Sequence, residues 1–222
     1  MTEALISARP VDDDARVRRA SRELLLERGA TLHVLFVCTG NICRSPIAER
    51  LTTAYTARFE LPAVSASSAG TRAVVAHPMH HEAATVLVRL GGRPDNFSAR
   101  QFTPKVAATS NLILTMTKAH RSRVLEVVPR LLHKTFTLGE ASLLISHFGP
   151  ETVENLPELR SHLDADNVPE IDDPIGRPPE FFAKVGNQIA DLLPPVLDFC
   201  QRSSMSLSEP PSSPGPAGVA DS

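Results

Sequence analysis

The residues of this chain that could do chemistry lie close together in one short segment, Cys38-Thr39-Gly40-Asn41-Ile42-Cys43-Arg44-Ser45-Pro46. A cysteine thiolate is a strong nucleophile, and an arginine guanidinium matches two oxygens of a tetrahedral oxyanion. Gly40 and Asn41 tolerate the tight backbone turns that would curl the segment around an anion. The spacing of Cys38 and Arg44 therefore indicates covalent catalysis on a phosphate ester or a similar oxyanion.

Two predicted elements would position this segment. Residues 31–37 are apolar and rich in β-branched side chains, which is typical of a strand buried on both faces. Residues 45–59 predict a helix, with Pro46 in its first turn. A loop between a strand and a helix can turn its N–H groups inward, and the helix N-terminus adds further donors. We expect this positive environment to stabilise the thiolate of Cys38.

Strands and helices alternate along the rest of the chain. Further strands are predicted at 63–68, 111–116 and 134–137, and helices at 79–90, after 103–104, and at 118–127, 139–147, 151–163 and 178–201. Pro194 and Pro195 are expected to kink or split the last helix. This order predicts an α/β fold with a mostly parallel sheet, in which ligands bind beyond the carboxyl ends of the strands.

The composition predicts one folded domain at 31–201 in a chain of 222 residues. Residues 1–30 are expected to be an N-terminal extension with one helix at 13–28, and the Ser/Pro-rich residues 202–222 a disordered tail. With a net charge of -2, no attraction to nucleic acid or to a membrane surface is expected. Three cysteines and no signal-peptide pattern favour the cytoplasm, and the oligomeric state is left open.

The cysteine segment at 38–46 resembles the signature of low-molecular-weight protein tyrosine phosphatases. Other stretches within roughly 31–200 extend the resemblance: Ile47-Ala48-Glu49, Ser67-Ser68-Ala69-Gly70-Thr71, Leu112 to Met116, Ala119-His120-Arg121 and Asp173-Pro174. The resemblance implies a three-layer α/β sandwich with a four-stranded parallel sheet. It also implies a phosphatase that needs no cofactor or metal and acts on phosphorylated proteins.

The resemblance assigns roles to single residues. Cys38 would be the nucleophile and form a phosphocysteine, and Arg44 would bind the phosphoryl oxygens. Asp173, rather than the adjacent Asp172, would protonate the leaving oxygen and then activate water. The other residues of the phosphate-binding loop would be Thr39, Gly40, Asn41, Ile42, Cys43 and Ser45. Among these, the Asn41 side chain would hold the loop conformation and Ser45 would donate a hydrogen bond to the thiolate.

The other cysteines and the histidines have secondary roles in this interpretation. A reversible disulfide between Cys43 and Cys38 is a hypothesis that the resemblance supports; a small buried thiol is the alternative. Cys200 is expected to contribute to packing. His77, His80 and His81 cluster in the sequence, but no second ligand set follows at metal-binding spacing, so no metal site is predicted.

Two features bear on the substrate, and they disagree. Ile175 and Gly176 follow Pro174, where eukaryotic members of the family carry an aromatic pair against the phosphotyrosine ring. Some bacterial relatives with a similar Asp-Pro-x-Gly segment act on phosphoarginine, but they carry Thr at the position of Ile42. An apolar Ile is typical of tyrosine-directed members, and it lies inside the predicted anion site. We therefore predict hydrolysis of phosphotyrosine in proteins, with a protein-arginine phosphatase as the alternative.

Two further readings are less favoured. Arsenate reductase on the same fold would need additional cysteines to relay a disulfide, and none lies between Cys43 and Cys200. A non-catalytic phosphate-binding module would be indicated by the loss of Cys38, Arg44 or Asp173, and all three are present.

Overall fold

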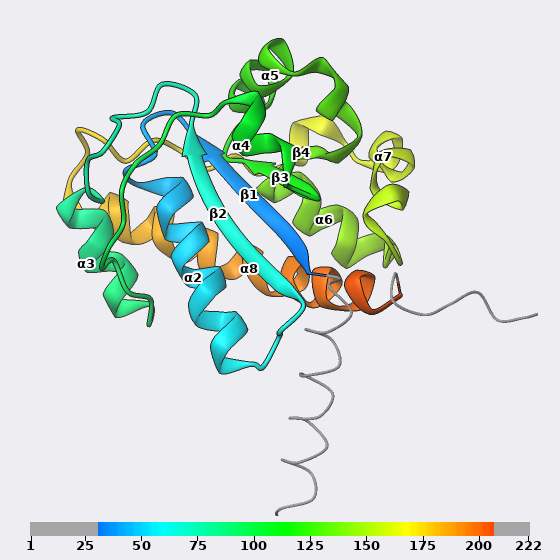
Figure 1. The fold of residues 1–222 in the computed structure, drawn as a ribbon, viewed down its shortest axis with the longest axis horizontal. Helices are drawn as coiled ribbons and strands as arrows, with labels where there is room; N and C mark the ends of the chain where they lie inside the picture. The colour runs from blue at the N-terminus through cyan, green and yellow to red at the C-terminus, as the bar shows by residue number, and fades with distance from the viewer. Residues whose placement is uncertain (1–30, 207–222) are drawn as a thin grey trace, which may run out of the picture.

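A four-stranded parallel sheet in the order β2-β1-β3-β4 organises residues 31–206, which are the part of the chain that the computed structural model describes (Figure 1). The strands are β1 (Leu32–Cys38), β2 (Val64–Gly70), β3 (Leu112–Thr115) and β4 (Thr135–Thr137). In the register of the sheet, Phe36 of β1 lies opposite Ser68 of β2 and Leu114 of β3. The predicted α/β class and parallel sheet are confirmed.

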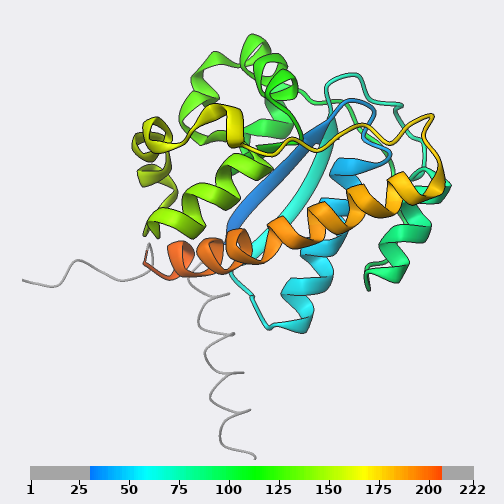
Figure 2. The same ribbon diagram turned by 180° about the vertical axis from the view of Figure 1, so that it is seen from behind.

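Helices cover both faces of the sheet and make three layers. On one face lie α2 (Arg44–Arg58), α6 (Leu138–Phe148) and α8 (Pro179–Ser206), with α3 (His81–Arg89) packed against α2 and α8. The other face carries α4 (Pro104–Ala108) and α5 (Lys118–Val127). Figure 2 shows α8 running across its face of the sheet. The predicted three-layer sandwich is therefore confirmed.

Burial on both faces explains the apolar run of β1. Val34 and Phe36 belong to the core beneath α2 and α8, whereas Leu35 and Val37 belong to the core beneath α4 and α5. Side chains alternate between the faces of a strand, so a central strand covered on both sides is apolar at nearly every position.

Two helical predictions need correction. The helix predicted at 151–163 is a series of short turns, η2 (Val153–Asn155), α7 (Leu156–Leu159) and η3 (Arg160–His162), because Pro157 has no backbone N–H to continue a regular helix. The last helix is a single element through Pro194 and Pro195 and continues beyond residue 201 to Ser206. Buried neighbours such as Leu193 and Val196 anchor it. Residues 202–206 are thus helical, not part of a disordered tail.

Other predictions fall outside the described residues. These are the helix at 13–28 within the N-terminal extension and the remainder of the tail at 207–222. Within residues 31–206, no helix is both long and apolar enough to cross a membrane.

The topology places the cysteine segment at the crevice of the sheet. After β1 the chain passes through α2 to β2 on one side, and it returns to add β3 on the other side of β1. Loops at such a reversal of strand order diverge and leave a crevice beyond the carboxyl ends of the strands. Residues 39–43 form the loop that follows β1 at this position.

Candidate active site

The loop between β1 and α2 turns its carbonyl groups outward. The carbonyl oxygens of Cys38, Thr39, Gly40 and Ile42 accept hydrogen bonds of 2.8–3.0 Å from backbone N–H groups within residues 71–80. In the part of the chain that the structure describes, the backbone N–H groups of residues 40–43 have no protein acceptor. A row of unpaired N–H groups next to a helix N-terminus has the geometry that favours binding of an anion.

Two backbone features permit this tight loop. Asn41 has a φ of 56°, in the left-handed region that asparagine tolerates better than most residues. Gly70, at the end of β2, lets the neighbouring strand approach closely, because a Cβ there would lie 2.4 Å from the carbonyl oxygen of Thr39. The predicted Asn41 turn is confirmed, whereas the requirement for Gly70 became visible only in the folded chain.

Cys38 lies at the base of this loop beside a hydroxyl group. Its Sγ is 2.9 Å from the Oγ of Ser45, and the Cys38 residue is 2% exposed. The Asn41 amide nitrogen donates to the same Ser45 Oγ at 3.0 Å. Since that Oγ accepts from Asn41, its own proton can be donated to Cys38 Sγ or to the Ala69 carbonyl, which lies 3.4 Å away. This is the contact that sequence analysis expected between Ser45 and Cys38.

Sequence analysis did not predict the next links of this hydrogen-bond chain. Asn41 Nδ2 also donates to Ser68 Oγ at 2.8 Å, and Ser68 Oγ donates to Glu49 Oε2 at 2.5 Å. The orientation of the Asn41 amide is fixed because its Oδ1 accepts from the Arg100 N–H. Burial raises the pKa of Glu49, and the hydrogen bond from Ser68 opposes that rise. One signal was available: Glu49 follows Ser45 by four residues, which places both on one face of α2.

Arg44 and Asp173 meet although 129 positions separate them in the sequence. Arg44 Nη2 donates to Asp173 Oδ2 at 2.6 Å, and Arg44 Nη1 donates to the Ile171 carbonyl at 3.1 Å. The Arg44 Nε is buried and has no hydrogen-bond partner among the described residues. The Arg44 side chain is 5% exposed, whereas that of Asp173 is 49% exposed. A buried, fixed guanidinium with a free donor is suited to bind an oxyanion.

His120 connects the loop to the start of α5. Its Nε2 is 2.8 Å from Thr39 Oγ1, and its Nδ1 is 2.8 Å from Thr117 Oγ1. Burial and, to a lesser extent, the Arg44 cation lower the pKa of His120 to about 4, although Asp173 opposes this shift. The imidazole is therefore neutral at physiological pH and can donate from one nitrogen only.

The two remaining cysteines are buried thiols. Burial, the neighbouring Cys38 and Asp173 raise the pKa of Cys43 to about 12, against a smaller opposing effect of Arg44. Cys43 and Cys38 are both free. Cys200 is fully buried in the core, as predicted, and burial raises its pKa to about 12.

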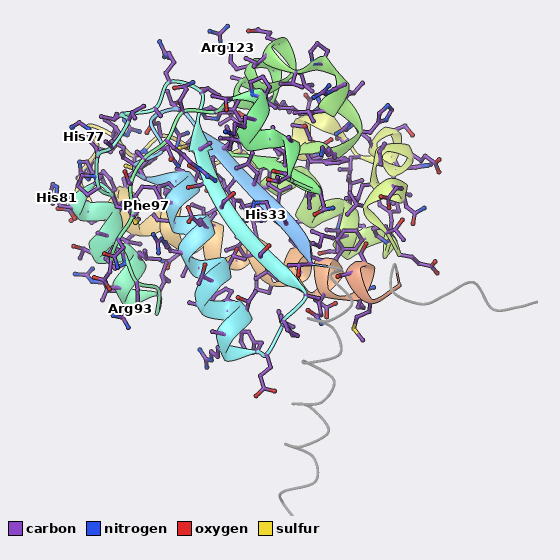
Figure 3. The ribbon with its side chains drawn as sticks, in the orientation of Figure 1. His33, His77, His81, Arg93, Phe97 and Arg123 are labelled. Atoms are coloured by element: carbon purple, nitrogen blue, oxygen red, sulfur yellow. The ribbon has the colours of Figure 1, made fainter. Side chains whose placement is uncertain are left out.

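The histidines at 77–81 border the site without forming a metal centre. The His80 ring stacks on those of His81 and Phe182, and the His80 N–H donates to the Ile42 carbonyl. Figure 3 shows His77 and His81 at the outer surface near α3. Among residues 31–206, no group of three or more His, Cys, Asp or Glu side chains is placed to hold a metal ion.

Aliphatic side chains border the cysteine loop. A Cβ at Gly40 would lie 3.4 Å from the Ile42 side chain and 3.6 Å from that of Val74. Val74 is 39% exposed and Ile175, two residues after Asp173, is 48% exposed. The backbone N–H of Ile175 donates to Asp173 Oδ1 at 3.2 Å, so the position of Ile175 is linked to that of the carboxylate. Apolar surface therefore borders the loop of residues 39–43.

This fold and this loop define a cysteine-containing oxyanion site of the phosphatase type, and the comparisons with known proteins identify the family. The family model described as Low molecular weight phosphotyrosine protein phosphatase matches residues 33–203. The chain belongs to this family of enzymes.

Relatives from several bacteria support the assignment. The low molecular weight protein-tyrosine-phosphatase Etp of Escherichia coli K12 is 39% identical over 107 residues, which are 48% of this chain and 69% of Etp. Wzb of Salmonella typhi is 36% identical over 106 residues, 48% of this chain and 68% of Wzb.

Solved structures share the fold. The low molecular weight protein tyrosine phosphatase of T. tengcongensis has a TM-score of 0.62 and 26% identity, covering 76% of this chain and 99% of its own. The YwlE arginine phosphatase of Geobacillus stearothermophilus has a TM-score of 0.63 and 25% identity, covering 79% of this chain and 96% of its own. The structural neighbours thus include both tyrosine and arginine phosphatases.

Proposed function

We propose that this enzyme hydrolyses phosphotyrosine in proteins through a cysteinyl-phosphate. The observation that carries the proposal is that one segment, residues 38–44, holds Cys38, the unpaired N–H groups of residues 40–43 and the buried Arg44 guanidinium with its unpaired Nε. A thiolate there would attack phosphorus in line with the leaving oxygen, while the N–H groups and guanidinium bind the three other oxygens. The phosphate-binding residues would be Thr39 to Cys43 and Ser45.

Asp173 supplies the proton in this proposal. Its half-exposed carboxyl group would donate to the tyrosyl oxygen as the P–O bond breaks, leaving phosphocysteine and free tyrosine hydroxyl. The resulting carboxylate would then take a proton from water that attacks the phosphocysteine, which releases phosphate and restores the Cys38 thiolate. The Ser45 hydroxyl stabilises this thiolate as the leaving group.

The aliphatic border of the loop supports the choice of phosphotyrosine. Ile42, Val74 and Ile175 offer apolar contact to an aromatic ring, and none of them donates a side-chain hydrogen bond to a guanidino group. The absence of an aromatic pair after Asp173 and the similarity to YwlE favour a protein-arginine phosphatase as the second candidate. The free thiols of Cys38, Cys43 and Cys200 fit action in a reducing compartment, which we propose is the cytoplasm.

Steady-state hydrolysis of matched phosphotyrosine and phosphoarginine peptides, without added metal, tests the proposal. We expect turnover of the phosphotyrosine peptide, its loss in Cys38→Ser, and a shift toward phosphoarginine in Ile42→Thr. If the wild type hydrolyses only the phosphoarginine peptide, the proposed substrate is wrong and the proposed mechanism stands. Failure to hydrolyse either peptide would refute the proposed activity.

A further inference from the structure

The loop of residues 39–43 is held from two sides by contacts of different kinds. On one side, its carbonyl oxygens accept hydrogen bonds from backbone N–H groups of residues 71–80. On the side of α5, a side-chain contact holds it, because Thr39 Oγ1 lies 2.8 Å from His120 Nε2. In Figure 1 the arrow of β2, which runs parallel to β1, points to the same upper end of the molecule at which α5 lies. The contact from α5 therefore depends on where the protons of an imidazole and a hydroxyl group lie.

The His120 ring has a hydroxyl neighbour at each nitrogen. Its Nδ1 lies 2.8 Å from Thr117 Oγ1, and the same oxygen caps α5 by accepting from the backbone N–H of His120 at 3.2 Å. The imidazole is neutral at physiological pH, because burial lowers the pKa of His120 to about 4. A neutral imidazole carries one N–H, so it donates to one of the two threonines and accepts from the other.

Two proton arrangements satisfy the chain formed by Thr117, His120 and Thr39. In the first, the Thr117 hydroxyl donates to Nδ1 and Nε2–H donates to Thr39 Oγ1, so the Thr39 proton is left over. In the second, Nδ1–H donates to Thr117 Oγ1 and the Thr39 hydroxyl donates to Nε2, so the Thr117 proton is left over. Among residues 31–206, neither hydroxyl has a further acceptor for that proton.

A phosphoryl group bound at the loop would decide between the two arrangements. Thr39 directly follows Cys38, and the charges of Arg44 and Asp173 both act on the His120 imidazole, so the chain lies near the proposed phosphate site. In the first arrangement the leftover Thr39 proton finds a charged acceptor in the phosphoryl group, and such hydrogen bonds are the strong ones. In the second, Thr39 presents only lone pairs to the anion. The bound anion thus favours the proton on Nε2.

We propose that His120 is a positioning residue of this enzyme, which holds Thr39 against α5 and directs the Thr39 hydroxyl proton to an oxygen of the phosphoryl group. The inference rests on the proposed function, because it needs a phosphoryl group at the loop. Thr117 sets the direction of the chain, since its oxygen caps α5 and its proton goes to Nδ1. Thr39 thereby adds a donor to those of the loop backbone and Arg44.

The position of the imidazole proton tests this direction without any turnover. Nitrogen NMR of the His120 side chain is recorded on full-length Cys38→Ser saturated with inorganic phosphate, and the signals are assigned by their absence after His120→Asn. We expect the proton on Nε2 and an unprotonated Nδ1. A proton on Nδ1 in the phosphate-bound protein would overturn the proposal, because Thr39 would then donate to His120 instead of the anion.

Kinetics with the phosphotyrosine peptide test the contribution to turnover. Thr39→Val should lower kcat/KM by about 10–100-fold, the range for loss of a hydrogen bond to a charged group, whereas Thr39→Ser should stay within about threefold of the wild type. His120→Ala should cause a smaller loss, since the Thr39 hydroxyl remains but is no longer directed. In the Thr39→Val background, His120→Ala should cause no further loss. Additive losses would mean that His120 acts independently of Thr39, which would overturn the proposal.

Two helix caps of the same kind provide a matched control for Thr117. Thr103 caps α4 with the same extended backbone, by accepting from the Val106 N–H, but its hydroxyl bonds to no residue of the loop. Thr117→Ala and Thr103→Ala should lose similar stability in urea unfolding, whereas only Thr117→Ala should lower kcat/KM. Thr117→Ser keeps both the cap and the proton and should restore the wild-type value. Equal kcat/KM in Thr117→Ala and Thr103→Ala would leave Thr117 as a helix cap alone and would contradict the proposal.

The outcomes separate this inference from the proposed function. If the wild type hydrolyses the peptide and Thr39→Val and His120→Ala match it, the positioning role is wrong and the proposed function stands. If the wild type hydrolyses no peptide, the proposed function is wrong, and the affinity of Cys38→Ser for inorganic phosphate then tests the chain. That affinity should fall about 10–100-fold when Thr39→Val is added, and an unchanged affinity would refute the role of Thr39.

Discussion

Asp173 holds Arg44 through a 2.6 Å ion pair, so the proposed general acid rests on the guanidinium that is expected to bind phosphate. A phosphoryl group entering the loop would compete with Asp173 for Arg44 Nη2. The Ile171 carbonyl keeps Arg44 Nη1 in place during such an exchange. The Asp173 side chain, which is half exposed, would be the partner that moves toward the leaving oxygen.

Replacement of Asp173 tests its role as the acid. We expect Asp173→Asn to lower kcat for a phosphotyrosine peptide by about 10²–10⁴-fold, because the tyrosyl oxygen would leave unprotonated. The loss should be smaller for aryl phosphates with acidic leaving groups, which need no proton. Steady-state kinetics over a series of aryl phosphates measures this dependence. Asp172→Asn is the control and should resemble the wild type; a matching loss in that variant would reassign the acid.

The hydrogen-bond chain behind the nucleophile predicts an effect from residues that do not touch substrate. Ser68→Ala should lower kcat about tenfold with a smaller change in KM, since Asn41 would lose the acceptor that helps to fix its amide. Glu49→Gln keeps an acceptor for Ser68 and should be milder than Glu49→Ala. Kinetics and urea unfolding are measured together. Thr56→Ala serves as the control, because Thr56 carries an exposed hydroxyl on α2, the helix that also carries Glu49. A fall in the stability of Ser68→Ala without a fall in its kcat would contradict the positioning role.

Oxidation by peroxide distinguishes the two hypotheses for Cys43, which are a reversible disulfide with Cys38 and a buried thiol that only packs. If Cys38 is oxidised to a sulfenic acid by peroxide, the Cys43 thiol can condense with it to a disulfide and release water. The wild type should then regain activity after treatment with a thiol reductant. In Cys43→Ser, excess peroxide should oxidise the unprotected Cys38 sulfenic acid further to a sulfinic acid, which a thiol reductant does not restore. Activity before and after reduction, with mass spectrometry of the peptide that contains both cysteines, measures this. Recovery of Cys43→Ser to the wild-type level would leave Cys43 as a packing residue, and Cys200→Ala controls for loss of a buried thiol.

His120 predicts a dependence of stability on pH. In the unfolded chain His120 takes up a proton near the ordinary histidine pKa of 6.5, whereas in the folded chain its pKa is about 4. The unfolded state therefore binds more protons between these values, and the free energy of unfolding falls as pH drops from 6.5 toward 4, by up to about 3 kcal/mol. Urea unfolding between pH 7.5 and 5 should show this fall in the wild type and a shallower one in His120→Asn. The exposed His133→Asn should retain the wild-type slope; an unchanged slope in His120→Asn would exclude His120 as its source.

The sequence alone determined the order of the elements and the local chemistry of the loop. An apolar run long enough for one strand, followed by Cys38, Gly40, Asn41 and Arg44, predicts a strand, an anion-binding turn and a helix. These features depend on residue types within a few positions, because backbone dipoles and allowed φ values act locally. The same locality explains why a split of α8 was expected: Pro194 and Pro195 weaken a helix in isolation, and burial against the core compensates only in the folded chain.

The tertiary structure decided which distant residues serve the loop. Ser68 reaches Asn41 because β2 pairs with β1 in the sheet. Gly70 is required because the Thr39 carbonyl oxygen packs against its Cα in the folded chain. Likewise, His120 meets Thr39 and Asp173 meets Arg44 because parallel strands bring their carboxyl ends to one edge of the sheet. No spacing along the chain encodes these contacts. They follow from the packing of helices and strands that burial of the apolar core selects.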